Sequence, residues 1–153
     1  MGFYSAKKEE WTKTNVCESC AIYGLDGSLW AASPKWKGLS EYDHTQEGLG
    51  EEATVVKVNE FKILEAVSQG NRNPSAAGAR LCKEKFLLTT HDEGVSMLTK
   101  TGGGGGTVAR TGKAIVVGFW DKEALMSNKL NQNSGDVAIN VERIAKFMKL
   151  AGF

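Results

Sequence analysis

Short apolar runs separated by glycine-containing turns dominate the second half of the chain. Strands are expected at about residues 79–82, 85–91, 94–100, 107–111 and 113–120. The turns between them are only a few residues long, and connections this short join antiparallel neighbours. Near the start, Asp26-Gly27 separates two further strand-like runs and predicts a hairpin. The pattern therefore predicts an antiparallel sheet of about six or seven strands.

Helical spacing appears in three segments. Residues 3–14 are polar and rich in Lys and Glu, and they predict a helix that is stable only when docked. Asn59 is a suitable N-cap for a short helix that ends at Gly70. A C-terminal helix, capped by Ser134 or Asp136, has the apolar stripe Val137, Val141, Ile144 and Met148. Helices that flank a strand meander are typical of an α+β fold, in which they cover the apolar faces of the sheet.

The segment from Pro34 to Thr54 has no clear period. It contains several glycines and acidic residues, and we expect a loop-rich insertion with one short helix there. A chain of 153 residues is expected to form a single domain with one substantial core. We therefore predict one domain over residues 1–153, with an insertion at about 35–58.

The glycine run Gly102–Gly106 invites a phosphate-binding interpretation, which the neighbouring residues exclude. In a P-loop, Gly-Lys is followed by Ser or Thr and then by a helix, whereas Gly112-Lys113 is followed by Ala114 and a strand. The dinucleotide-binding pattern fails as well, because its third glycine would fall at Thr107. We expect the run to be a mobile hairpin loop, in which glycine adopts positive φ at no steric cost.

Composition narrows the function classes. The formal net charge of +1 argues against a nucleic-acid-binding protein that works by bulk basicity. No apolar run approaches the roughly 20 residues that span a bilayer, and the N-terminus lacks the apolar core of a signal peptide. The expected location is cytoplasmic. His44 and His91 are the only histidines and lie in different predicted segments, so the residues indicate no catalytic cluster.

The motif Cys17-Glu-Ser-Cys20 leaves two interpretations open. Its spacing is that of zinc and redox sites, but zinc needs two further ligands and the chain has no second paired motif. A thioredoxin-like motif leads into a helix, whereas Cys20 leads into the strand-like run Ala21-Ile-Tyr. The favoured interpretation is packing of small apolar side chains at a helix–strand junction. No metal or cofactor is expected.

Four stretches, in this order, resemble the profilin family of small actin-monomer-binding proteins. They are Ala21 to Ala31 with its Asp26-Gly27 turn, Lys85-Phe-Leu-Leu before Asp92-Glu-Gly, Lys100 to Phe119 with Arg110-Thr-Gly-Lys, and Asn140 to Phe153. Each is weak alone, but their order over nearly the whole chain is specific. The resemblance implies a divergent, protist-type member. It also implies a central antiparallel sheet, with the N- and C-terminal helices packed on one face and small helices on the other.

The resemblance also implies two binding surfaces. The surface for monomeric actin would be formed by Lys85, Leu87, Thr90, Lys100, Gly135, Ile139, Asn140 and Arg143. An aromatic groove for proline-rich ligands, such as formin segments, would be formed by Phe3, Tyr4, Trp30, Phe147, Met148 and Phe153. A polyproline II segment is already extended, so it loses little entropy when it docks on aromatic rings. Lys7 stands where the family usually has an aromatic residue.

The implied activity is the stoichiometric, non-enzymatic regulation of actin polymerisation and the cytoskeleton by a monomer. Phosphoinositide binding is a further family property, for which Lys85, Lys100, Arg110, Lys113, Arg143 and Lys146 would supply a basic patch. The alternative is an adaptor that docks proline-rich or lipid partners without actin.

Overall fold

The computed structural model describes residues 16–46 and 53–153. Its centre is a seven-stranded sheet in the order β2-β1-β9-β8-β7-β6-β5, with antiparallel neighbours throughout. The strands are β1 (Ser19–Gly24), β2 (Leu29–Ala32), β5 (Ala79–Leu81), β6 (Glu84–Asp92), β7 (Val95–Lys100), β8 (Gly104–Arg110) and β9 (Ala114–Asp121). The predicted strand meander and the α+β fold class are confirmed.

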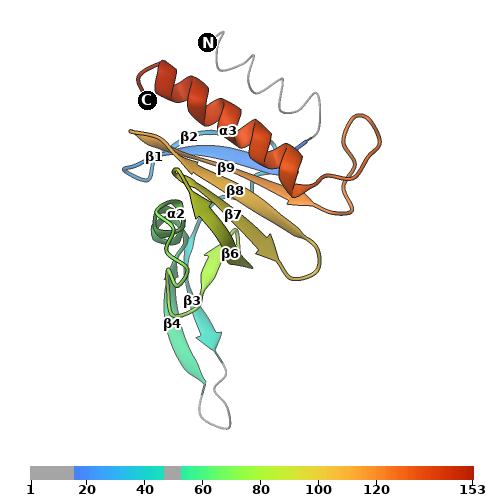
Figure 1. Cartoon of the computed structure of the whole chain (residues 1–153). Coiled ribbons are helices and arrows are strands. Elements are labelled where there is room, and N and C mark those ends of the chain that lie inside the picture. Colours follow the sequence, from blue (N-terminus) through green and yellow to red (C-terminus); the bar gives the residue numbers. More distant parts are fainter. Residues whose placement is uncertain (1–15, 47–52) are drawn as a thin grey trace.

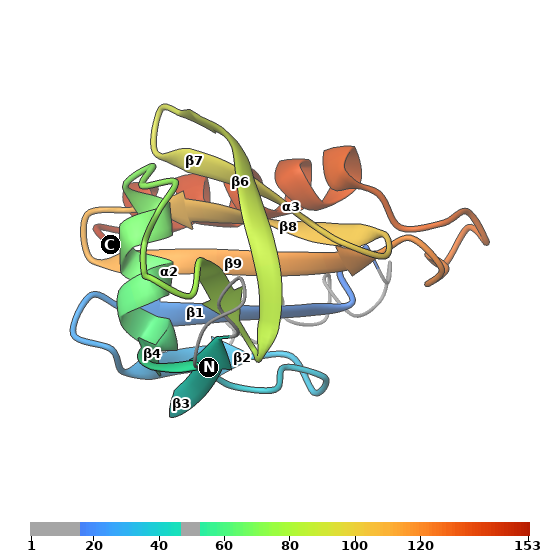
Figure 2. The same ribbon diagram turned by 90° about the horizontal axis from the view of Figure 1, so that it is seen from below.

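Two helices cover opposite faces of this curled sheet (Figures 1 and 2). Helix α3 (Ser134–Leu150) buries the predicted stripe of Val137, Val141, Ile144 and Met148 against β8 and β9. Helix α2 (Glu60–Ser68) packs Ile63, Leu64 and Val67 into a larger core on the other face. The helix predicted over residues 3–14 lies outside the described residues.

Asparagine side chains begin both helices. The Asn59 side chain accepts a hydrogen bond from the Lys62 backbone N–H, as predicted for an N-cap of α2. For α3 the predicted caps, Ser134 and Asp136, are wrong: Asn133 is the cap and its Oδ1 accepts from Asp136 N at 3.0 Å. Asp136 instead lies in the first turn, where a carboxylate is favoured by the helix dipole.

For the described residues between Pro34 and Thr54, the expectation of a loop-rich segment with a short helix is wrong. This part of the chain contributes a second, two-stranded sheet made of β3 (Glu41–Gln46) and β4 (Thr54–Asn59), which projects from the domain in Figure 1. The buried carboxylate of Glu60 holds its base, because it accepts hydrogen bonds from Ser40 N at 2.9 Å and Lys83 N at 2.7 Å. The predicted bounds of an insertion at 35–58 stay a prediction.

The glycine run is a strand for most of its length, which corrects the expectation of a mobile loop. Gly104, Gly105 and Gly106 are buried in β8 and pair with β9. A Cβ at Gly105 would lie 2.1 Å from the Leu98 backbone oxygen, and one at Gly106 would lie 2.5 Å from Cδ1 of Phe119. Phe119 in turn stacks between Trp36 and Phe86, with ring centroids at 5.4 and 4.9 Å. These glycines are therefore explained by close packing.

Candidate functional site

Two exposed aromatic rings meet at one end of the sheet. Trp30 on β2 and Phe153, just beyond α3, lie edge to face with centroids 5.7 Å apart and ring planes at 74°. They remain 41% and 44% exposed, respectively. An exposed pair of large rings is unusual, because aromatic side chains gain most from burial. We call this pair the aromatic platform.

The Phe153 end of the platform is fixed by backbone hydrogen bonds. The Phe153 backbone oxygen accepts from Thr111 Oγ1 at 2.8 Å and from Lys113 N at 2.7 Å, both in the turn between β8 and β9. Its N–H donates to the Met148 backbone oxygen at 2.8 Å. The backbone that carries the Phe153 ring is therefore held in place, although the ring itself is exposed.

The Trp30 end is fixed by a short chain of polar side chains. Trp30 Nε1 donates to Ser28 Oγ at 3.1 Å, and Ser28 Oγ donates to Asp26 Oδ1. These hydrogen bonds from Ser28 also lower the pKa of the Asp26 carboxyl. The indole lies against Gly24, where a Cβ would come within 2.7 Å of Nε1. Both rings are thus held in place before any ligand binds.

The other residues predicted to bind the proline-rich ligand differ in their exposure. Phe147 is partly exposed on α3, whereas Met148 is buried in the core beneath that helix. Met148 can therefore support the platform but offers no surface to a ligand. Phe3 and Tyr4, together with the departure at Lys7, lie outside the described residues.

A second exposed surface lies on the α3 side of β6. Strand alternation sends Phe86 and Leu88 into the α2-side core and leaves Lys85 and Leu87 facing the other way, with Leu87 65% exposed. Thr90 pairs with Met97, and the pairing continues to Thr107 and Gly118, which lies under α3. Gly135, Ile139 and Arg143 are exposed on α3 itself. We define the β6–α3 surface by six residues of these two elements: Lys85, Leu87, Thr90, Gly135, Ile139 and Arg143.

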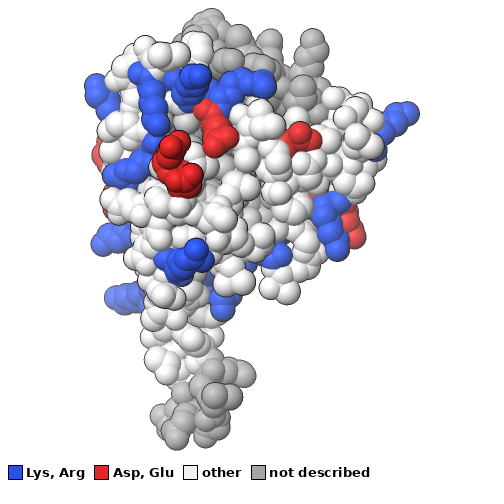
Figure 3. Space-filling view, viewed as in Figure 1, with Lys and Arg blue, Asp and Glu red and all other residues white. Residues whose placement is uncertain are grey.

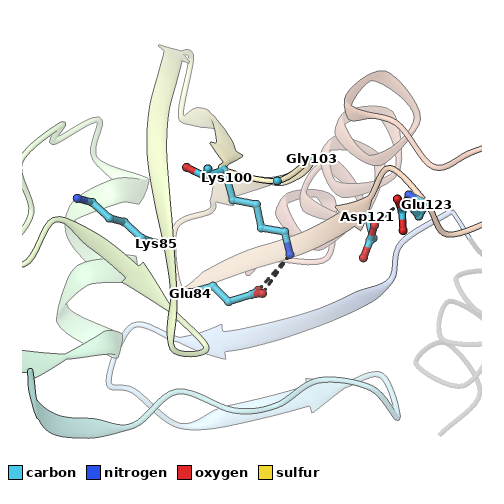
Figure 4. Close-up of a pocket in the computed structure, with 8 residues that line it drawn as sticks. Glu84, Lys85, Lys100, Gly103, Asp121 and Glu123 are labelled. Carbon is cyan, nitrogen blue, oxygen red and sulfur yellow. Dashed lines mark hydrogen bonds and ion pairs between the residues drawn. The ribbon is translucent and has the colours of Figure 1, made fainter.

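Two of the residues predicted for actin do not belong to this surface. Lys100 pairs with Phe86 and thus faces the α2 side, where its Nζ lies 3.1 Å from Glu84 Oε1 (Figure 4). Asn140 is only 8% exposed, and its Nδ2 donates to Cys17 Sγ at 3.7 Å. In this conformation, neither side chain is available on the β6–α3 surface.

Lys100 also borders an open pocket of about 410 Å³. Glu84, Asp121 and Glu123 line it together with Lys85 and Lys100, so its charge is mixed (Figure 4). No group of three or more His, Cys, Asp or Glu side chains that could hold a metal ion occurs in the described part of the chain. The pocket thus lacks the ligand set of a metal site and the excess positive charge expected for a phosphate site.

Lysine and arginine side chains gather over the end of the molecule where α3 ends (Figure 3). A groove of about 230 Å³ runs there between α3 and the sheet, and Arg110, Lys146 and Lys149 line it with Glu142.

Neither helix that the structure describes is long and apolar enough to cross a membrane.

Sequence reasoning missed one pair of side chains that resembles catalytic machinery. His91 Nδ1 lies 2.8 Å from Ser96 Oγ. Ser96 is fully buried, and its hydroxyl donates to the Val67 backbone oxygen at 2.6 Å. With its proton committed and its oxygen inaccessible, Ser96 cannot act as a nucleophile, and the pair instead ties β6 and β7 to α2. No spacing in the sequence indicated it.

A curled antiparallel sheet with helices on both faces and a preorganised aromatic pair defines a small α+β binding domain. The profilin family model matches residues 1–153, so the chain belongs to the profilin family and the resemblance is confirmed. A profilin of Tetrahymena pyriformis is 30% identical over 139 residues, which are 86% of this chain and 88% of that protein.

Solved profilin structures share the fold at lower identity. Acanthamoeba castellanii profilin IA superposes with a TM-score of 0.65 at 20% identity, over 96% of this chain and 98% of that one. Mouse profilin IIa, solved in complex with a double repeat from the FH1 domain of mDia1, gives 0.62 at 15% identity, over 98% and 99% of the two chains.

Proposed function

We propose that this protein binds monomeric actin through the β6–α3 surface and proline-rich segments through the aromatic platform. The observation that carries the proposal is the match of the profilin family over the whole chain. The action is stoichiometric and non-enzymatic: the protein occupies the actin face needed at growing pointed ends and leaves addition at barbed ends possible. It thereby regulates actin polymerisation and the cytoskeleton in the cytoplasm.

The composition of the β6–α3 surface supports a protein partner. Leu87 and Ile139 are large apolar side chains exposed among the charged side chains of Lys85 and Arg143. Apolar anchors within a polar surround are the usual organisation of a protein interface. Lys100 faces the other side of the sheet, so Lys85 and Arg143 are the cations that this surface contains among the residues predicted for actin. With two cations there, the association rate should depend only modestly on ionic strength.

The platform supports the proline-rich half of the proposal. Proline rings pack on flat aromatic faces, and a preformed polyproline II helix loses little entropy on docking. Trp30 and Phe153 provide such faces without rearrangement. The formin FH1 segment bound to mouse profilin IIa is a ligand of this chemical class.

Two assays test the two halves separately. In pyrene-actin assembly, an equimolar amount of the protein should slow spontaneous polymerisation, and gel filtration should show a 1:1 complex with monomeric actin. Intrinsic tryptophan fluorescence should change when a proline decapeptide is added, because Trp30 lies in the platform. Absence of an actin complex at tens of micromolar protein would contradict the first half, and a decapeptide without effect would contradict the second.

An actin-independent adaptor is the second candidate, and the platform is the observation that favours it, because neither of its rings belongs to the β6–α3 surface. This candidate predicts peptide binding with no actin complex in the same two assays. Phosphoinositide binding stays a prediction: Arg110 and Lys146 line one groove, whereas Lys100 is on the other face.

A further inference from the structure

The Cys17-Glu-Ser-Cys20 motif places two thiols side by side beneath α3. Cys20 lies in β1 opposite Gly118 of β9, and Cys17 lies just before the start of β1. Cys17 Sγ would be 3.2 Å from a Cβ at Gly118, so the absent side chain leaves room for the sulfur. The Cys20 thiol hydrogen-bonds to the Cys17 thiol, and both side chains belong to the core under α3.

The surroundings of Cys17 favour its thiolate. The hydrogen bond from Cys20 is the larger cause and the bond from Asn140 adds to it, so the pKa of Cys17 is lowered although burial acts against this. Asn140 Nδ2 donates to Cys17 Sγ at 3.7 Å, the usual length for a bond to sulfur. The thiolate is the form that attacks oxidants.

Cys82 is an internal comparison within the same protein. It is 7% exposed and Cys17 is 8% exposed, so access from solvent is nearly equal. Burial, with the negative charge of Glu60 as a further cause, raises the pKa of Cys82 to about 12. A difference in reactivity between Cys17 and Cys82 therefore reports chemical environment rather than exposure.

We propose that Cys17 and Cys20 are a redox-active dithiol, which hydrogen peroxide converts into an intramolecular disulfide. The Cys17 thiolate attacks one peroxide oxygen, the O–O bond breaks, and the released hydroxide takes up the proton that Cys17 lost, forming water. The sulfur of Cys20 then loses its proton and attacks the sulfenic sulfur of Cys17. The S–O bond breaks, and hydroxide leaves with that proton as a second water. Two thiols are oxidised while one peroxide is reduced to two waters.

The disulfide would change the contact between β1 and α3. A disulfide sulfur carries no negative charge and is a weaker acceptor than a thiolate, so the hydrogen bond from Asn140 would be weaker than its bond to the Cys17 thiolate. Residues 137–144 of α3 should then open more readily, whereas α2, on the opposite face of the sheet, should be unaffected. Thiol reductants reverse the change by thiol–disulfide exchange. This inference does not depend on actin binding.

Mass spectrometry of the intact protein tests the proposal. After peroxide treatment at pH 7.5, the protein should lose about 2 Da, the mass of two hydrogens. Alkylation under denaturing conditions should then modify Cys82 alone, and dithiothreitol should restore all three sites. Hydrogen exchange at residues 137–144 should rise in the oxidised protein. Three alkylatable thiols after treatment, oxidation of Cys82 at the same rate, or unchanged exchange in α3 would overturn the proposal.

Two variants refine the assignment. Cys20→Ser removes the resolving thiol, so Cys17 should accumulate as a sulfenic acid that dimedone traps. Cys82→Ser is the matched control and should form the disulfide at the parent rate. If Cys20→Ser does not fold, the mass change and alkylation pattern of the parent protein still decide the question.

Discussion

Phe153 lies edge to face with Trp30, with ring centroids 5.7 Å apart, although Trp30 is on β2 early in the chain and Phe153 follows the last helix. The contact joins the end of α3 to the edge strand β2. It depends on the turn between β8 and β9, because Thr111 and Lys113 hold the Phe153 backbone. One aromatic contact thus reports the positions of three separate elements.

Phe153→Ala should weaken binding of a proline decapeptide by about twofold to tenfold, since an aromatic contact is worth roughly 0.5–1.5 kcal/mol. Fluorescence titration measures the affinity. Leu150→Ala is the matched control, because Leu150 is 82% exposed at the same end of α3 and is not one of the two platform rings. Equal affinity of the parent and Phe153→Ala would refute a role for the platform, and both variants should bind actin like the parent.

Leu87→Asp should weaken the complex with monomeric actin by at least about tenfold, because it replaces an apolar anchor with a charge that would have to be desolvated. Val55→Asp is the control: Val55 is 60% exposed, close to the 65% of Leu87, but lies on the projecting β4. Titration of pyrene-actin assembly gives both affinities. Equal loss in the two variants would move the interface away from the β6–α3 surface.

Gly106→Ala should lower the free energy of unfolding by about 1–3 kcal/mol or more, the usual effect of overpacking. Its Cβ would approach Cδ1 of Phe119 to 2.5 Å and the Gly118 backbone oxygen to 2.8 Å. At Gly112 the nearest such contact is 3.5 Å, so Gly112→Ala should be nearly neutral. Urea unfolding compares the two variants. If Gly106→Ala were equally neutral, the close-packing explanation of the glycine run would be wrong.

Stability should decrease in alkaline solution, because burial raises the pKa of Cys82 to about 12 and also raises that of Tyr23. Above about pH 9 the unfolded chain loses the Cys82 proton while the folded chain keeps it. The free energy of unfolding therefore falls as pH rises. The decrease amounts to about 1.4 kcal/mol per pH unit for a fully shifted group. The lowered pKa of Cys17 has the opposite effect: it makes the free energy of unfolding rise with pH, but only below pH 9, where the thiol of the unfolded chain titrates.

The variant Cys82→Ala should show a shallower loss of stability between pH 9 and pH 10.5, even if its stability at pH 7.5 is lower. Urea unfolding with a reductant present gives both slopes. Parallel slopes in the parent and the variant would show that Cys82 does not keep its proton in the folded state. The remaining slope of the variant includes the contribution of Tyr23, whose pKa burial also raises.

Local pattern was sufficient for most of the fold. Asp26-Gly27, the alternation around Phe86 and the stripe from Val137 to Met148 each fix an element through interactions of neighbouring residues, and all three are present as predicted. The pair β3 and β4 was missed because β3 is mostly polar, as in Glu41-Tyr-Asp-His-Thr-Gln46, so its sequence shows little apolar alternation. Its inner face is only partly buried: Tyr42 and Val56 pack against the core beside the buried Val58.

The candidate site depended on information that local pattern does not contain. Lys100 and Leu87 appear equally suited to a surface, but strand register pairs Lys100 with Phe86 and directs it to the opposite face. Asn140 appears exposed on a polar helix, yet it meets a cysteine that is 123 positions away in the chain. Gly105 and Gly106 leave no room for a side chain, because Leu98 and Phe119 pack against them. Only the assembled sheet brings these neighbours near, so the sequence alone suggests a loop.

The anchored backbone of Phe153 also has a practical consequence. Any reporter or affinity tag fused after this residue would start next to the Trp30 indole, and its first residues would compete with a peptide for the same rings. Labels intended for binding studies belong on β3 or β4, which project from the domain away from α3 (Figure 1).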